Sequence, residues 1–210
     1  MKTTLTQKTV FAIIWSFLER FGVKGISLLF SILLARILTP DDYGIVAMPM
    51  IFLSLAHCLV DCGFGEAIIR KEQLNSEDIN TAFIFNVSLS LVLYIGLFIL
   101  APLIADFYQV SVLRQILRIS SFSVLLAPWC MVQKALLIRQ LQFKCIGIIG
   151  LVSSLISGFV GLFMAMCGCG VWSLIVQTIG TLLIEILLLW INSPYRPKLE
   201  WSEGSFRYLW

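Results

Sequence analysis

The sequence predicts an all-α protein, a polytopic membrane helix bundle with six transmembrane helices. Six apolar stretches nearly fill the 210-residue chain, and about 20 apolar residues are enough for a helix to cross a hydrocarbon layer of about 30 Å. Hydrophobic residues make up 59% of the chain and charged residues only 13%, whereas a soluble domain carries about 25% charged residues. The charges lie mainly in the gaps between the stretches. Helices are expected because lipid offers the backbone no hydrogen-bond partner.

The apolar stretches follow one another with only short polar segments between them. They cover residues 10–35, 45–64, 79–104, 117–138, 146–166 and 171–191. The first is too long for a cleavable signal peptide and lacks a small-residue cleavage site, so we expect it to stay as an anchor. We therefore expect residues 1–192 to form a six-helix N-terminal transmembrane lobe. Residues 193–210 are expected to form a cytoplasmic linker and the start of a seventh helix.

Lysine and arginine residues predict the orientation of the bundle. If the N-terminus is cytoplasmic, that side of the membrane receives Lys2, Lys8, Arg70, Lys71, Arg139, Lys144, Arg196 and Lys198. The opposite side receives Arg36 and Arg114. Because short loops rich in lysine and arginine stay in the cytoplasm, we expect a multi-pass protein with a cytoplasmic N-terminus.

Local signals in the loops predict where individual helices begin. Thr39-Pro40-Asp41-Asp42 offers a capping residue, a proline at the first helical position and acids in the first turn. Asn75-Ser76-Glu77-Asp78 offers a similar start before the third span. Pro49 in the second span and Pro128 in the fourth mark positions where a helix can kink.

The first span carries a polar stripe within its apolar run. Three ionic residues, Glu19, Arg20 and Lys24, lie inside it. Spacings of three and four residues place on one helical face Ser16, Arg20, Lys24, Ser27 and Ser31. One interpretation is a cavity wall that receives an anion such as a phosphate, because two cations outnumber one acid. The alternative is internal pairing, in which Glu19 neutralises a neighbouring cation or a cation reaches another helix.

The second span places His57 and Asp61 one turn apart on the same face. An imidazole beside a carboxylate can take part in a proton relay. The alternative is a purely structural pair. Since Asp61 lies near the cytoplasmic end of the span, it could instead cap the helix or pair with Arg70.

The sixth span contains one acid, Glu185, within an otherwise apolar run. A charge inside a bilayer is costly and usually has a partner. We expect Glu185 to meet a cation from another span, with Arg20 or Lys24 as the first candidates. A coupling-ion site is the alternative interpretation.

The fourth span is the most amphipathic of the six. Arg114 and Arg118 are one turn apart near its start, and Gln133 and Lys134 lie towards its other end. Arg114 and Arg118 either sit at the outer interface, where long side chains extend to water, or form a second basic wall opposite the first span.

The fifth span and the cysteines show no chemistry of their own. Ser157, Gly161 and Ala165 recur every four residues, a spacing of small side chains that lets helices approach closely. Neither the Cys58/Cys62 pair nor the Cys167-Gly168-Cys169 turn has the further ligands that a closed zinc site needs. We expect no metal, no cofactor and no enzyme activity. The whole sequence suggests a helical bundle with a moderately cationic interior that handles an anionic, partly lipidic substrate.

Several segments resemble a known family. The run LARILTPDDYGIVAM at 34–48 resembles the first-loop signature of bacterial polysaccharide transporters of the oligosaccharide flippase (Wzx-type) family, and DCGFGEAIIRK at 61–71 resembles the family's segment after the second span. Shorter similarities lie at 80–83, 101–105, 135–139 and 170–174. Together they cover nearly the whole chain. The subgroup that the chain resembles most is the colanic-acid-exporter type of lipopolysaccharide biosynthesis protein.

The resemblance implies one lobe of a two-lobe transporter, in the superfamily that also holds multidrug extruders and lipid II flippases. The implied activity is the flipping of undecaprenyl-diphosphate-linked oligosaccharide from the cytoplasmic to the periplasmic leaflet of the bacterial inner (plasma) membrane. Cavity cations would meet the diphosphate, and the candidates are Arg20, Lys24, Arg118 and Lys134. The implied partners are membrane lipid, a C-terminal lobe and the glycan polymerase machinery, and no nucleic acid. Because the chain holds one lobe, we expect it to be truncated.

Two other functions remain open at this point. A multidrug-type, ion-coupled exporter would share the fold, and an acid-rich cavity would favour it. A non-transporting membrane scaffold of the glycan assembly machinery is the third hypothesis.

Overall fold

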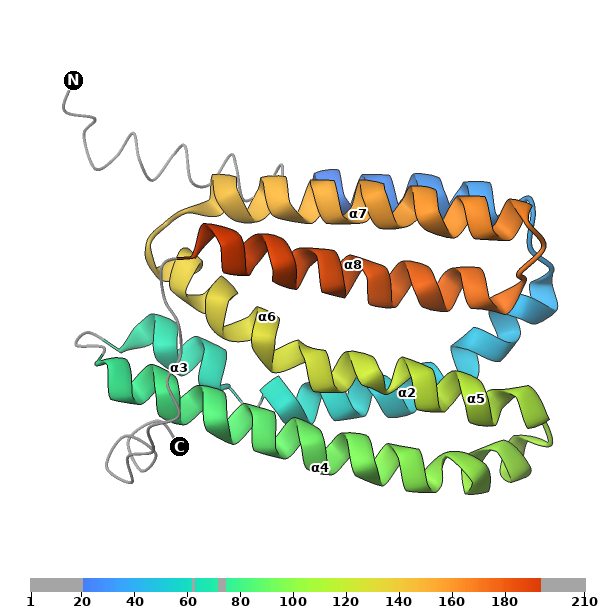
Figure 1. Cartoon of the computed structure of the whole chain (residues 1–210), viewed down its shortest axis with the longest axis horizontal. Helices are drawn as coiled ribbons and strands as arrows, with labels where there is room; N and C mark the ends of the chain where they lie inside the picture. Colours follow the sequence, from blue (N-terminus) through green and yellow to red (C-terminus); the bar gives the residue numbers. More distant parts are fainter. Residues whose placement is uncertain (1–20, 62, 72–74, 194–210) are drawn as a thin grey trace.

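The computed structural model describes residues 21–61, 63–71 and 75–193, and the regular structure in these ranges is α-helical. The helices run side by side along the long axis of the molecule (Figure 1). An unlabelled helix, Phe21–Ala35, comes first. It is followed by α2 (Pro40–Asp61), α3 (Phe64–Arg70), α4 (Ser76–Tyr108), α5 (Ser111–Ser120), α6 (Phe122–Arg139), α7 (Phe143–Met166) and α8 (Val171–Asn192).

The described helices confirm an all-α membrane bundle. Five helical segments are long and apolar enough to cross a membrane, namely α2 with α3, α4, α5 with α6, α7, and α8. The remaining predicted span, 10–35, is described only over Phe21–Ala35, which is a shorter apolar helix. Its charged residues Glu19 and Arg20 lie outside the described residues. The division into a lobe and a linker stays a prediction.

The side chains are distributed as expected for a protein surrounded by lipid. Large apolar side chains face outward, such as Ile51 at 69% exposure and Ile191 at 75%. Polar side chains such as Asn86, Ser90 and Ser153 are fully buried. Lipid is as apolar as leucine, so helices associate through close packing and hydrogen bonds between them.

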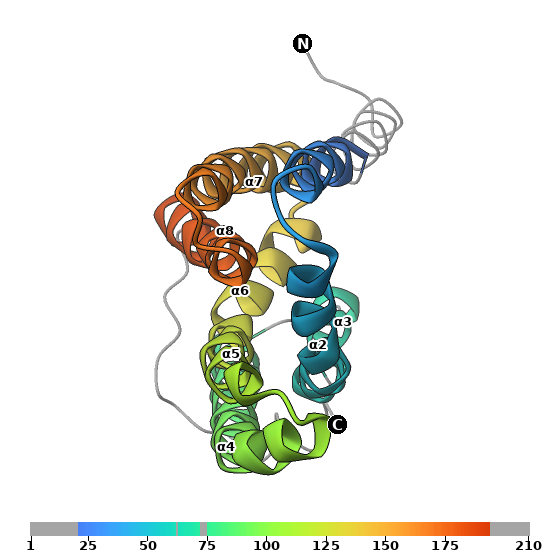
Figure 2. The ribbon, with the colours of Figure 1, turned by 90° about the vertical axis from the view of Figure 1, so that its right-hand side faces the viewer.

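Close packing is clearest between α7 and α8, which lie side by side in both views (Figures 1 and 2). A Cβ atom added at Gly161 would lie 2.9 Å from Cβ of Gln177. The Ser157 hydroxyl donates to the carbonyl of Gln177, and a Cβ atom at Gly180 would lie 3.1 Å from Oγ of Ser157. The small residues of the fifth span therefore serve helix packing, as the sequence predicted.

Two predicted spans are interrupted. The fourth is divided into α5 and α6 at Ser121. The backbone of Ser121 stays helical, with φ of −63° and ψ of −19°, and its hydroxyl donates to the carbonyl of Arg118. Between α2 and α3, Gly63 has φ of +79°, a left-handed conformation that favours glycine. Pro49 and Pro128 lie inside α2 and α6.

The two predicted helix starts are confirmed. At α2, the backbone N–H of Thr39 donates to Oδ2 of Asp42 at 3.0 Å, and the N–H of Asp42 donates to Oγ1 of Thr39 at 3.3 Å. At α4, the N–H of Asn75 donates to Oδ2 of Asp78 at 3.0 Å. Both are reciprocal capping arrangements.

Replacing Thr39 by valine is expected to lower the free energy of unfolding by about 1 kcal/mol, because the valine cannot accept the N–H bond at the start of α2. Unfolding in detergent, followed by circular dichroism, would measure it. Thr178→Val is the matched control: this hydroxyl only bonds to the carbonyl of Leu174 one turn back in the same helix. Equal losses in the two variants would contradict the capping role.

Candidate functional site

An ion pair inside the bundle joins α6 to α8. Nζ of Lys134 lies 2.6 Å from Oε1 of Glu185, and the two side chains are 36% and 13% exposed. The prediction that Glu185 meets a cation of another span is confirmed, and the cation is Lys134 instead of Lys24, while Arg20 lies outside the described residues. The helix that carries Lys24 packs on α7, where a Cβ atom at Gly158 would overlap the ring of Phe30. The neighbour that α8 offers to Glu185 is therefore α6.

A hollow of about 430 Å³ lies beside this pair, and we call it the ion-pair pocket. Figure 2 shows α6 between α8 and α2. The pocket is lined by residues of α2, α6 and α8 and by residues of α3, including Gly65 and Glu66 at its start. Its ionisable lining residues are His57, Asp61, Glu66, Cys130 and Lys134. The fold thus gathers candidates from three segments that are far apart in the sequence.

Two acids and one lysine line the described pocket, and both acids, Asp61 and Glu66, are exposed, so the cationic interior stays a prediction. Asp61 and Glu66 line it and Glu185 is bonded at its edge, against the single lysine Lys134. Other cations of the chain are used at the helix ends. Arg70, for example, pairs with Glu66 across 3.4 Å at the protein surface instead of with Asp61.

His57 is half-buried and contacts α6. Its Nε2 lies 3.2 Å from Oγ of Ser123, so the imidazole ties α2 to α6 across the bundle. Asp61, one turn later, lines the same pocket. Whether the two residues relay protons or serve structure stays a prediction.

Cys130 is a pocket residue that the sequence did not single out. It is 5% exposed and lines the ion-pair pocket together with Lys134. Its spacing of one helical turn from Lys134 was the available signal. In the sequence Cys130 is interpreted as a small apolar residue. Its place beside the Lys134–Glu185 pair depends on the tertiary fold, because the two charged residues come from different helices.

The polar stripe of the first span is uncovered where the structure describes it. Lys24, Ser27 and Ser31 are exposed, whereas Phe30 and Leu34 of the same helix are buried. This helix therefore packs through Phe30 and Leu34, and its polar stripe stays open, as do apolar residues such as Leu29. A cavity wall formed by this face stays a prediction.

Arg118 lies apart from the ion-pair pocket. Its guanidinium carbon is 4.3 Å from the centre of the Phe98 ring, and it lines a different hollow between α4, α5, α6 and α8. Arg114, one turn earlier, is exposed. The two arginines do not form one wall, and Arg118 does not share a pocket with Lys134.

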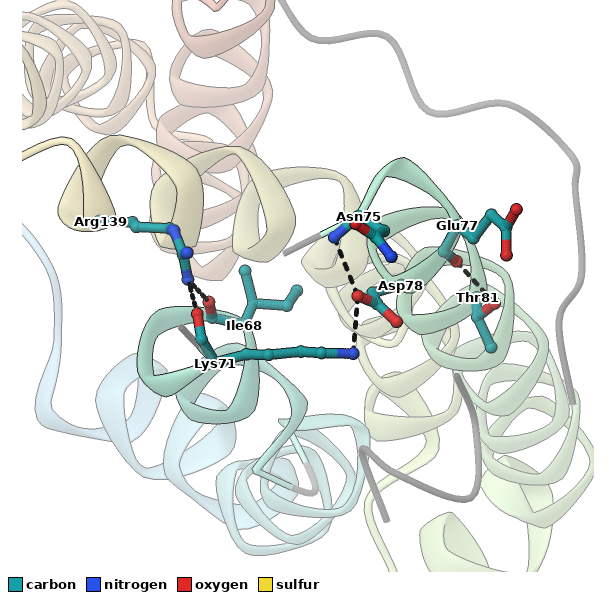
Figure 3. A network of polar contacts seen from close by, with 7 residues as sticks. All are labelled: Ile68, Lys71, Asn75, Glu77, Asp78, Thr81 and Arg139. Carbon is teal, nitrogen blue, oxygen red and sulfur yellow. Dashed lines mark hydrogen bonds and ion pairs between the residues drawn. The ribbon is translucent and has the colours of Figure 1, made fainter. Parts of the chain in front are cut away.

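A polar network ties together the ends of α3, α4 and α6 (Figure 3). Arg139 at the end of α6 donates to the carbonyl of Ile68 at 2.9 Å and to the carbonyl of Lys71. Nζ of Lys71 lies 2.7 Å from Oδ2 of Asp78, which also caps α4. The sequence predicts that Lys71 and Arg139 are loop charges that set the orientation. In the structure they also connect the ends of α3, α4 and α6.

Arg139→Lys is expected to lower the free energy of unfolding by about 1.5 kcal/mol, because a lysine cannot reach two carbonyls with one planar group. Thermal unfolding in detergent would test this. Arg70→Lys is the control, since its exposed pair with Glu66 contributes about 0–1 kcal/mol. A loss in Arg139→Lys no larger than in the control would show that the two carbonyl bonds are dispensable.

Among the described residues, no three histidine, cysteine or acidic side chains lie close enough together to hold a metal ion.

The fold and the pocket define an integral membrane helix bundle with charged groups held between its spans. The chain belongs to the polysaccharide biosynthesis protein family, whose model matches residues 33–210. This confirms the resemblance seen in the sequence.

The chain is also similar to individual proteins of polysaccharide biosynthesis. The chain is 27% identical over 203 residues to the succinoglycan biosynthesis transport protein ExoT of Rhizobium meliloti, covering 96% of this chain and 41% of that protein. It is 27% identical over 156 residues to the lipopolysaccharide biosynthesis protein WzxC of Escherichia coli, covering 74% of this chain and 32% of WzxC. A third relative is the teichuronic acid biosynthesis protein TuaB of Bacillus subtilis, at 24% identity over 73% of this chain and 32% of TuaB. The chain thus spans well under half the length of these relatives. No solved structure is significantly similar to it.

Proposed function

We propose that this chain acts in the translocation of an undecaprenyl-diphosphate-linked oligosaccharide from the cytoplasmic to the periplasmic leaflet of a bacterial inner membrane. The observation that carries the proposal is the Lys134–Glu185 pair beside a hollow inside a membrane bundle. The family supports it, since a relative is named as a succinoglycan biosynthesis transport protein. The proposed orientation places the N-terminus in the cytoplasm, and the proposed partners are a second lobe and the glycan polymerase machinery.

The ion pair suggests how a diphosphate enters the pocket. Glu185 neutralises Lys134 when the pocket is empty, and a diphosphate that reaches the exposed third of Lys134 competes with the carboxylate for the same ammonium group. Lys24 on the open polar stripe, with Arg20 beside it in the sequence, is the proposed entry contact. No covalent step is needed, so the proposed function is transport and not catalysis.

Complementation tests the proposal. The chain is expressed in an Escherichia coli strain that lacks WzxC, alone and with the part of WzxC that the chain does not match. Surface polysaccharide and accumulated lipid-linked oligosaccharide are then measured. Restored export in either combination is expected, and Lys134→Ala and Lys24→Ala should lower it. Arg114→Ala, which removes an exposed cation, is the control.

Two outcomes would contradict the proposal. Restoration by neither combination, while intact WzxC restores export, would argue against transport and for a scaffolding role if the chain still co-purifies with the polymerase. Normal export in Lys134→Ala and Lys24→Ala would remove these residues as substrate contacts.

A second candidate is a multidrug-type, ion-coupled exporter, and the acid Asp61 beside His57 in the lining of the ion-pair pocket favours it. Asp61, Glu66 and Glu185 lie around one lysine and His57. Efflux of a fluorescent organic cation from cells would then fall in Asp61→Asn and be unchanged in Asp106→Asn, a control on an exposed acid of α4. No chain-dependent efflux would exclude this candidate.

A further inference from the structure

The hollow that contains Arg118, here called the Arg118 groove, has a volume of about 580 Å³ and lies between α4, α5, α6 and α8. Its walls are almost wholly apolar or aromatic, with Tyr94 and Phe98 from α4 and Trp172 and Leu183 from α8. Pockets for small ligands typically enclose about 300–1,000 Å³. The groove is therefore large enough for a chain-like ligand, and one cation lies in its wall.

The charge of Arg118 is incompletely satisfied. Its Nε atom is buried and has no hydrogen-bond partner among the described residues. Its guanidinium packs over the ring of Phe98, and no carboxylate of a described residue forms an ion pair with it. A buried N–H donor without an acceptor is costly. An acceptor that entered the groove would supply the missing contacts, and a phosphate fits the planar fork of an arginine.

The groove opens on a surface that meets lipid. Its lining residues Phe98, Ile119 and Leu183 are 39%, 44% and 40% exposed. Lining residues run along α8 from Trp172 to Leu183, a length of about 17 Å at 1.5 Å per residue. Arg118 lies two turns inside the start of α5, at about 10 Å. A phosphate at that depth with a hydrocarbon chain along α8 matches the shape and polarity of the groove.

We propose that the Arg118 groove binds one anionic phospholipid of the surrounding bilayer, with its phosphate on Arg118 and one acyl chain along α8. The lipid fills the space between α4 and α8 and completes the charge balance of the arginine. It is a bound component of the protein rather than the transported molecule, which we assigned to the ion-pair pocket. The proposal depends on membrane insertion and not on the transport activity.

Lipid retention tests this. The full chain is purified, stripped of lipid, and incubated with dioleoyl phosphatidylglycerol or dioleoyl phosphatidylcholine, and bound lipid is counted by native mass spectrometry. One phosphatidylglycerol per chain is expected, in preference to phosphatidylcholine. Arg118→Gln should lower its affinity about tenfold. Val176→Phe, which fills the groove and leaves Arg118 in place, should also lower retention.

Arg114→Gln is the matched control. Arg114 lies one turn before Arg118 and carries the same charge, and it does not line the groove. Size-exclusion chromatography establishes that each variant is folded, and Arg118→Lys replaces Arg118→Gln if the latter is not. Equal losses in Arg114→Gln and Arg118→Gln would overturn the proposal, because they would reflect overall charge. Displacement of phosphatidylglycerol by an equal concentration of undecaprenyl phosphate would also overturn it, by making the groove a carrier site. Since binding is read without transport, a failure of the export experiment leaves this result unaffected.

Discussion

Replacing Glu185 by glutamine is expected to lower the free energy of unfolding by about 3 kcal/mol. The substitution keeps the shape of the side chain and leaves the ammonium group of Lys134 in the bundle without its counter-charge. Removing one partner of this partly buried pair is costly because the remaining charge keeps only part of its hydration and has lost its partner. Reversible unfolding of the purified protein in detergent or bicelles would measure the loss.

The double variant Lys134→Met/Glu185→Met separates stability from function. Replacing both charges by apolar side chains of similar size is often neutral for stability, so this variant should unfold near the wild-type temperature. It should nevertheless lose export, because no cation remains at Lys134 for the diphosphate. If Glu185→Gln unfolds like the wild type, the pair is not a stabilising contact. If the double variant exports normally, the pocket is not the substrate site.

Gly158→Ala is expected to cost about 2 kcal/mol through overpacking. The ring of Phe30 lies where the new methyl group would be placed, and this ring is itself held edge-on against Phe159 at a centroid distance of 5.3 Å. Phe30 is 6% exposed, so it has little room to move. The helix Phe21–Ala35 would therefore be pushed away from α7.

Gly96→Ala is the matched control for this prediction. It lies within α4, and a Cβ atom there meets nothing within 4 Å. Removing a helical glycine without a clash should raise stability by about 0.5–1 kcal/mol. Cysteine cross-linking between the first described helix and α7 would show whether the two separate. A Gly158→Ala variant as stable as Gly96→Ala would show that this contact is easily rearranged.

Helix positions were largely predictable because the signals for them are local. Hydropathy locates each apolar run, and the caps at Thr39 and Asn75 locate two helix starts to the residue. The break at Ser121 was not predictable, because its backbone stays helical and no proline or glycine lies beside it. Hydropathy reports that a segment is buried in lipid, and it does not report small changes in helix direction.

The site was less predictable because it depends on which helices are neighbours. Helices that are apolar nearly all round give little indication of which face meets which partner. The choice of Lys134 over Lys24 for Glu185 follows from the packing of the first described helix on α7, which no local pattern records.

The segments that carried the family resemblance acquire a physical meaning in the fold. Segments 61–71 and 135–139 meet at the Arg139 network, next to the start of α4 (Figure 3). Segments 34–48 and 170–174 meet at the opposite end, where Oδ1 of Asp42 lies 3.3 Å from a Cβ position at Gly170. The family pattern therefore marks contacts that hold helix ends together.

The length of α4 gives the bundle a sensitivity to membrane thickness. At 1.5 Å per residue its 33 residues reach about 50 Å, whereas the hydrocarbon layer is about 30 Å thick. A helix that exceeds this thickness must tilt, project beyond the layer or locally thicken it. Since the Lys71–Asp78 pair holds its first turn to the end of α3, a change in the tilt of α4 would be passed on to α3. A thinner or thicker bilayer would thus act as a mechanical input to the helices around the ion-pair pocket.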